Sequence, residues 1–183
     1  GFEDVVIWER GVLTDIFSPE DPVEHDLPKP IWVYVGRVAV EKNIEGFLDL
    51  DLPGSKMIIG DGPDRERLAE AYPDCHFPGY KFGRELAQAQ AGADVFVFPS
   101  RTDTFGIVML EAMACGLPVA AFPVTGQIDV VRPGETGILD NDLASACTRA
   151  LELDPADCRR YAESRSWTRS TEQFVANLAP RAG

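Results

Sequence analysis

Two carboxylates, Asp103 and Glu111, stand eight positions apart around an apolar stretch of the chain. Residues Phe105 to Cys115 are apolar almost all round, which is typical of a buried helix. Glu111 is the one charge inside it, and an unpaired buried carboxylate is costly. We therefore expect Glu111 to meet a partner, either an arginine or a hydroxyl of a bound ligand. Asp103 lies about 12 Å earlier at helical rise, at the mouth of the helix, where capping the helix is an alternative role.

Basic residues follow the apolar run Ile31–Val35. Gly36 and Arg37 come directly after it, and Lys42 is five residues further on. A glycine there lets a ligand approach the backbone, and Arg and Lys are suited to phosphate oxygens. The alternative is a pair of solvated surface cations.

The pattern around these residues predicts an α/β fold in which short strands alternate with helices. Such an alternation gives a Rossmann-like parallel sheet with helices on both faces. The predicted strands are Ile31–Gly36, Lys56–Gly60, Cys75–Phe77, Asp94–Phe98, Pro118–Phe122 and Gly137–Leu139. The predicted helices are Asn43–Leu50, Pro63–Ala71, Phe82–Ala91, Phe105–Cys115, Gly126–Val131, Leu143–Leu153, Ala156–Ala162 and Trp167–Leu178, with a further short strand at Phe2–Trp8.

The composition excludes several classes of function. A net charge of −13 argues against nucleic-acid binding and against docking on anionic lipid. No apolar run is long enough to cross a membrane, and the four cysteines have no metal-like spacing. We read the cysteines as reduced, mostly buried thiols of a cytoplasmic protein. The chain has no initiator Met and no recognisable signal peptide, so we expect it to be part of a longer protein.

Two Asp-x-Asp pairs, Asp49/Asp51 and Asp140/Asp142, are the only candidates for a divalent metal site. Both lie where helices are expected to end or begin, so we interpret them as caps and solvated ends. We predict no metal and no cofactor. His25 and His76 are isolated and are assigned structural roles. The chain contains neither the glycine-rich dinucleotide fingerprint nor a phosphate-binding P-loop.

The segments Pro99–Gly106 and Glu111–Val119 resemble the donor site of retaining GT-B glycosyltransferases of family 4, which use nucleotide-sugar donors. Glu111 matches the second acidic residue of that site, and Asp103 stands where the family usually has Glu. The resemblance implies that Arg37 and Lys42 bind the diphosphate, that Asp103 touches the donor sugar and that Glu111 holds the ribose. It further implies donor contacts from Gly36, Gly62, Tyr80, Thr104, Phe105 and Gly106. The alternative for Gly62 is a plain strand-to-helix turn, with Asp61 capping the helix, and the alternative for Tyr80 and Phe82 is core packing.

The same resemblance implies a domain plan. Residues 1–30 correspond to a crossover from a missing N-terminal domain, 31–165 to the donor-binding domain and 166–183 to a helix packing toward the domain interface. The missing domain would bind a sugar, lipid or glycan acceptor and could associate with the membrane periphery. The implied reaction is metal-independent sugar transfer with retention, and we expect this part alone to bind donor weakly without turnover. The alternatives are a sugar-nucleotide epimerase of the same fold and a non-catalytic nucleotide-binding module.

Overall fold

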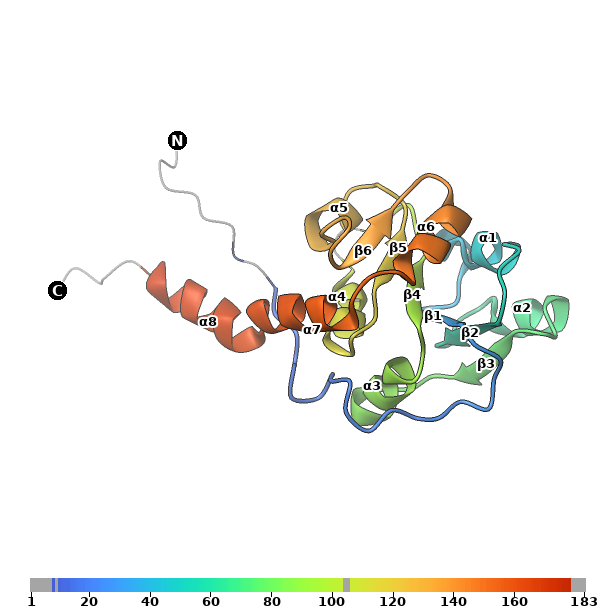
Figure 1. The fold of residues 1–183 in the computed structure, drawn as a ribbon, viewed down its shortest axis with the longest axis horizontal. Coiled ribbons are helices and arrows are strands. Elements are labelled where there is room, and N and C mark those ends of the chain that lie inside the picture. The colour runs from blue at the N-terminus through green and yellow to red at the C-terminus, as the bar shows by residue number, and fades with distance from the viewer. Residues whose placement is uncertain (1–7, 9, 104–105, 179–183) are drawn as a thin grey trace.

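The computed structural model describes residues 8, 10–103 and 106–178 and has one six-stranded sheet (Figure 1). The sheet order is β3-β2-β1-β4-β5-β6, and every neighbouring pair is parallel. The strands are β1 (Ile31–Val35), β2 (Ser55–Ile59), β3 (His76–Gly79), β4 (Val95–Phe98), β5 (Val119–Ala121) and β6 (Gly137–Leu139). This confirms the predicted α/β class with a Rossmann-like parallel sheet.

Helices cover both faces of the sheet, as the continuous apolar strands required. In β1, Ile31, Val33 and Val35 belong to one apolar cluster, whereas Trp32 and Tyr34 belong to the other. The first cluster includes side chains of α3 (Gly83–Ala91), α4 (Ile107–Ala114), α5 (Gln127–Val130) and α7 (Pro155–Ser164). The second includes side chains of α1 (Ile44–Leu48), α2 (Arg65–Ala71) and α6 (Leu143–Ala150).

Several helix boundaries differ from the prediction because the backbone leaves helical geometry. Asn43 is left-handed (φ 53°), so a short 3-10 turn, Val40–Lys42, precedes α1. Pro63 lies in a turn, and α2 begins two residues later. Gly106 is left-handed (φ 66°), so α4 begins at Ile107 rather than at Phe105, which lies outside the described residues. The predicted strand Phe2–Trp8 also lies outside them, except for Trp8, which is not in a strand.

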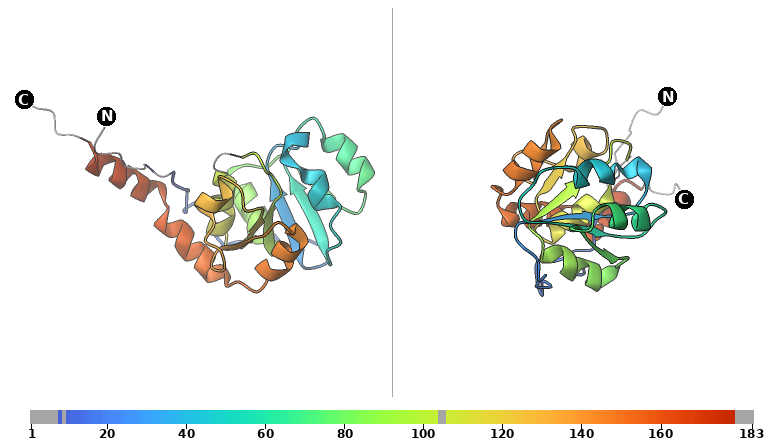
Figure 2. Two further views of the ribbon diagram at one scale, coloured as in Figure 1. Left: turned by 90° about the horizontal axis from the view of Figure 1, so that it is seen from above. Right: turned by 90° about the vertical axis from the view of Figure 1, so that its right-hand side faces the viewer.

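The segment around Val12 lies beside the junction of the last two helices, at residues 165–167. The N–H of Val12 donates to the carbonyl of Arg165 at 2.9 Å, and the N–H of Trp167 donates to the carbonyl of Val12 at 3.2 Å. A Cβ on Gly11 would lie 2.4 Å from the backbone of Trp167, so this close approach requires glycine. The last helix, α8 (Trp167–Ala176), extends away from the sheet (Figure 2). No helix in the described part of the chain has the length and hydropathy of a membrane span.

Candidate functional site

A cavity of about 780 Å³ opens at the carboxyl ends of β1, β2 and β4. The sheet order reverses between β1 and β4, and ligands of open α/β sheets bind at such a reversal. The cavity is lined by most of the residues that the sequence singled out: Gly36, Arg37, Lys42, Tyr80, Asp103, Gly106 and Glu111. Thr104 and Phe105 lie outside the described residues. Gly62 is not a lining residue, and its neighbour is the carbonyl oxygen of Val38, 2.2 Å from where a Cβ would stand.

Lys42 and Asp103, 61 positions apart, form an ion pair at the centre of this edge. The Lys42 Nζ lies 2.7 Å from Oδ1 and 2.9 Å from Oδ2 of Asp103, with about a fifth of each side chain exposed. The pair forms because Lys42 follows β1 and Asp103 follows the adjacent β4. The neighbouring Asn43 also donates from Nδ2 to the Pro99 carbonyl at 3.1 Å.

The alternative role of Asp103 as a helix cap is wrong. The cap position of α4 is Gly106, and among the described residues the Asp103 carboxylate accepts from Lys42 and not from the first turn of α4. Gly106, Ile107 and Val108 line the cavity, so the free N–H groups and the positive dipole end of α4 face it. Together with Lys42 and Arg37, this end forms a region suited to an anion.

Tyr34, which the sequence analysis missed, contacts both Gly36 and Arg37. The Tyr34 hydroxyl donates to the Arg37 carbonyl at 2.9 Å, and a Cβ on Gly36 would lie 2.7 Å from that hydroxyl oxygen. Burial, followed by the charges of Asp103 and Glu41, raises the pKa of Tyr34. The Arg37 side chain is largely exposed at the rim, 3.5 Å from Glu41, and is therefore free to reorient toward a ligand. The strand pattern put Tyr34 in the core and gave no sign of its contact with the turn.

Glu111 faces the cavity from α4, half-buried and without a partner. No described residue forms a hydrogen bond or an ion pair with its carboxylate, so the arginine considered as one of its two alternative partners is not found in this part of the chain. Burial raises the pKa of the Glu111 carboxyl from 4.5 to about 7. A carboxylate that is desolvated but unpaired can accept hydrogen bonds from a ligand that enters the cavity.

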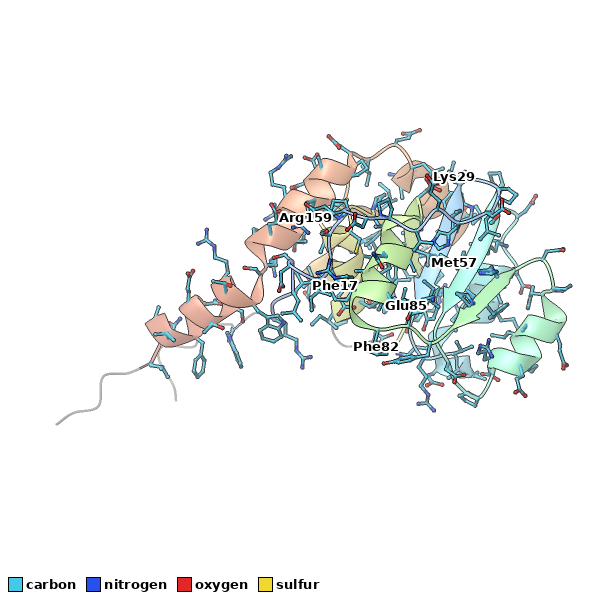
Figure 3. The ribbon with its side chains drawn as sticks, turned by 90° about the horizontal axis from the view of Figure 1, so that it is seen from below. Phe17, Lys29, Met57, Phe82, Glu85 and Arg159 are labelled. Atoms are coloured by element: carbon cyan, nitrogen blue, oxygen red, sulfur yellow. The ribbon has the colours of Figure 1, made fainter. Side chains whose placement is uncertain are left out.

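Tyr80 and Phe82 form an aromatic pair at the rim, in the connection between β3 and α3. Their ring centroids lie 6.2 Å apart with an interplanar angle of 26°, and the two residues are 71% and 70% exposed. Core packing, the alternative considered for both, is therefore wrong. Figure 3 shows Phe82 at the start of the helix that carries Glu85. Phe82 lines the cavity and was not among the predicted site residues.

The Asp-x-Asp pairs have structural partners. Asp142 caps α6 by accepting from the N–H groups of Ala144 and Ser145, and Asp140 pairs with Arg149 at 3.1 Å. Asp49 accepts from the Tyr72 hydroxyl at 2.5 Å. Within the described ranges, no three His, Cys, Asp or Glu side chains are grouped as metal ligands would be.

The part of the cavity wall that the N-terminal segment supplies was also missed. Leu13, Ile16 and Phe17 line it from the N-terminal segment, together with Arg10. These residues precede the sheet in sequence, and the sequence alone offers no periodicity that would place them at its carboxyl edge.

A family model described as "Glycosyl transferases group 1" matches residues 29–153. The chain is 40% identical over 147 residues to a GDP-mannose-dependent alpha-mannosyltransferase of Mycobacterium tuberculosis, covering 76% of this chain and 39% of that protein. It is 37% identical over 165 residues to a sulfoquinovosyl transferase of Arabidopsis thaliana, covering 80% and 32%. The chain therefore spans less than half the length of these relatives.

Solved structures agree on the fold. A sucrose-phosphate synthase from Thermosynechococcus elongatus superposes with a TM-score of 0.77 at 31% identity, covering 91% of this chain and 50% of that one. The lipopolysaccharide outer core galactosyltransferase WaaB in its apo form gives the same TM-score at 20% identity, covering 94% and 55%. The second likeness is one of fold alone.

Proposed function

Because this chain belongs to the group 1 glycosyl transferases, we propose that it binds the nucleoside-diphosphate sugar of a retaining, metal-independent transfer to an acceptor hydroxyl. Residues 31–165 form the donor-binding unit. Residues 1–30 are the crossover from a further domain, which binds the sugar, lipid or glycan acceptor. The helix in residues 166–183 packs toward that domain.

The observation that carries this proposal is the convergence of Lys42, Arg37 and Glu111 on one cavity at the reversal of the sheet order. Lys42, Arg37 and the first residues of α4 line the same cavity, so two cations and a helix dipole are available to one bound anion. A departing diphosphate gains negative charge, and charges already held in place stabilise it without reorganisation.

Glu111 accepts hydrogen bonds from the ribose of the donor. It lies in the same cavity, and the hydroxyls of a ribose can supply the hydrogen bonds that its carboxylate lacks. Asp103 touches the sugar next to the diphosphate in this proposal, which its ion pair with Lys42 in the same cavity supports. The name of the Mycobacterium tuberculosis relative makes GDP-mannose the first donor to test.

Thermal unfolding with added nucleotides tests the proposal. UDP, GDP and ADP are each compared with their monophosphates, with and without EDTA. We expect at least one diphosphate to raise the melting temperature more than its monophosphate, in EDTA as well as without it. A ligand at 100 times its Kd stabilises by about 2.7 kcal/mol. No shift with any diphosphate at millimolar concentration would contradict donor binding, and a shift abolished by EDTA would contradict metal independence.

A further inference from the structure

Arg159 on α7 binds the backbone of two segments that are far apart in sequence. Its Nη1 donates to the carbonyl of Phe17 at 2.7 Å and to that of Ala114 at 2.8 Å, and its Nη2 donates to the carbonyl of Thr14 at 3.1 Å. The Nε also pairs with Glu163 at 2.7 Å. Figure 3 shows Arg159 beside the segment that carries Phe17.

Both of the bound segments form walls of the cavity. Ala114 is the last residue of α4, less than one turn after Glu111, which faces the cavity. Thr14 and Phe17 belong to the segment whose Leu13, Ile16 and Phe17 side chains line another part of the cavity. One guanidinium group therefore links the helix that carries Glu111 to the segment that carries these apolar lining residues.

The chemistry of the contact requires arginine. The last carbonyls of a helix have no partner within the helix, and a cation at this end also suits the helix dipole. The planar fork of a guanidinium presents donors from separate nitrogens to several carbonyls at once, whereas the ammonium of lysine presents its three donors from a single atom. The Arg159 side chain is only 23% exposed, so its hydrogen bonds are partly shielded from water.

We propose that Arg159 is a positioning residue of the donor site, which holds segment 14–17 against the end of α4 and so sets the shape of the cavity. The proposal rests on the donor-binding function proposed above. Arg159 itself does not line the cavity, so its effect on a ligand passes through Glu111 and the apolar lining residues of the N-terminal segment.

The test compares Arg159→Ala and Arg159→Lys with Arg160→Ala in the 183-residue chain. Arg160 is the next residue on α7, is largely exposed and pairs with Asp157 of its own helix, which makes it a matched control. GDP and UDP are titrated separately by calorimetry, and amide hydrogen exchange is followed without ligand.

We expect Arg159→Ala to weaken nucleotide binding about tenfold, which corresponds to about 1.4 kcal/mol, and Arg160→Ala to leave it unchanged. The nucleotide affinity of Arg159→Lys should lie between those of Arg159→Ala and Arg160→Ala. Amide exchange in residues 12–17 should rise in both Arg159 variants while the amides of β1 and β4 stay protected. Guanidinium chloride at millimolar concentration, compared with sodium chloride, should partly restore affinity to Arg159→Ala, which a purely structural loss would not allow.

Equal affinities in Arg159→Ala and Arg160→Ala would overturn the proposal, as would unchanged exchange in residues 12–17. If Arg159→Ala did not fold, the affinity and amide exchange of Arg159→Lys would be compared with those of Arg160→Ala in the same way. If the unaltered chain bound neither nucleotide, the donor-binding function would fail, and the exchange data would still decide whether Arg159 holds segment 14–17.

Discussion

Glu111 has a half-buried carboxyl group that no described side chain pairs with. Replacing it by Gln keeps the shape of the side chain but removes the charge-assisted hydrogen bonds to a ligand, worth about 1.5–3 kcal/mol. We therefore expect Glu111→Gln to weaken nucleotide binding about ten- to a hundredfold. The urea midpoint of the unliganded chain should not fall, because no ion pair is broken. A large loss of stability with unchanged affinity would show that Glu111 has a structural partner instead.

The raised pKa of Glu111 also predicts a dependence of stability on pH. The carboxyl has a pKa of about 7 when folded and about 4.5 when unfolded. Between these values the folded chain holds a proton that the unfolded chain has lost. The stabilisation present below about pH 4.5 is therefore lost as the pH rises to about 7. Urea midpoints across this range should decline less in Glu111→Gln than in the unaltered chain, and parallel curves would contradict the assignment.

The ion pair of Lys42 and Asp103 has a consequence for ligand binding. Asp103 neutralises Lys42 and repels a phosphate that approaches it. We expect Asp103→Asn to strengthen binding of GDP or UDP, by up to about tenfold. The same variant should lose affinity for the corresponding nucleotide sugar relative to the nucleotide, because a sugar contact is weakened. Calorimetry with both ligands measures the two effects, and unchanged or weaker nucleotide binding would contradict competition for Lys42.

For individual residues, the sequence predicted which side chains face the cavity better than it predicted which groups those side chains contact. The resemblance to a donor site implied that Arg37, Lys42 and Glu111 share one site, and all three line the cavity; their types and spacing alone left solvated cations and an arginine partner open. The ion pair between Lys42 and Asp103 spans 61 positions and depends on β1 lying next to β4. Tyr34 and Arg159 donate hydrogen bonds to backbone carbonyls, and such contacts cannot be predicted from residue type or spacing.

Among the helices and strands, α4 follows a residue, Gly106, where a side chain would be both strained and crowded. Gly106 has a φ of 66°, and a Cβ there would lie 2.8 Å from Met109 Cε and 3.3 Å from Phe98 Cζ. We expect Gly106→Ala to lower the free energy of unfolding by about 2 kcal/mol, from backbone strain and crowding together. Gly134 has a φ of 80° with nothing within 4 Å, so Gly134→Ala should cost about half as much. Urea midpoints compare the two, and equal losses would show that crowding at Gly106 is absent.

The strands and helices were predictable in kind because the apolar runs of the sheet are continuous and the helices between them are periodic. Their ends were less predictable. The left-handed residues Asn43 and Gly106 displace the starts of α1 and α4, and this conformation is set by contacts with other segments. Segment 11–17 has no regular element, and its place beside α7 follows from tertiary contacts alone.

In the whole molecule, the order of the strands in the sheet determines where the cavity lies. β1, β2 and β3 extend the sheet in one direction, and β4 returns to the other side of β1, which leaves an opening between their carboxyl ends. The alternating strands and helices predicted a parallel sheet covered on both faces but not this strand order, and the resemblance implied that Lys42 and Glu111 belong to one site. They could not predict that the N-terminal segment closes one side of the opening.

Amide chemical shifts during titration with GDP and UDP locate the ligand directly. With 15N-labelled chain, we expect the largest changes at residues 36–42, 60–61, 80–83 and 106–111, all at the carboxyl edge of the sheet. The opposite edge, where Lys29 pairs with Asp94 at 3.0 Å, should remain unchanged. Changes that cluster at that opposite edge, or no changes with either nucleotide at millimolar concentration, would contradict the donor site described above.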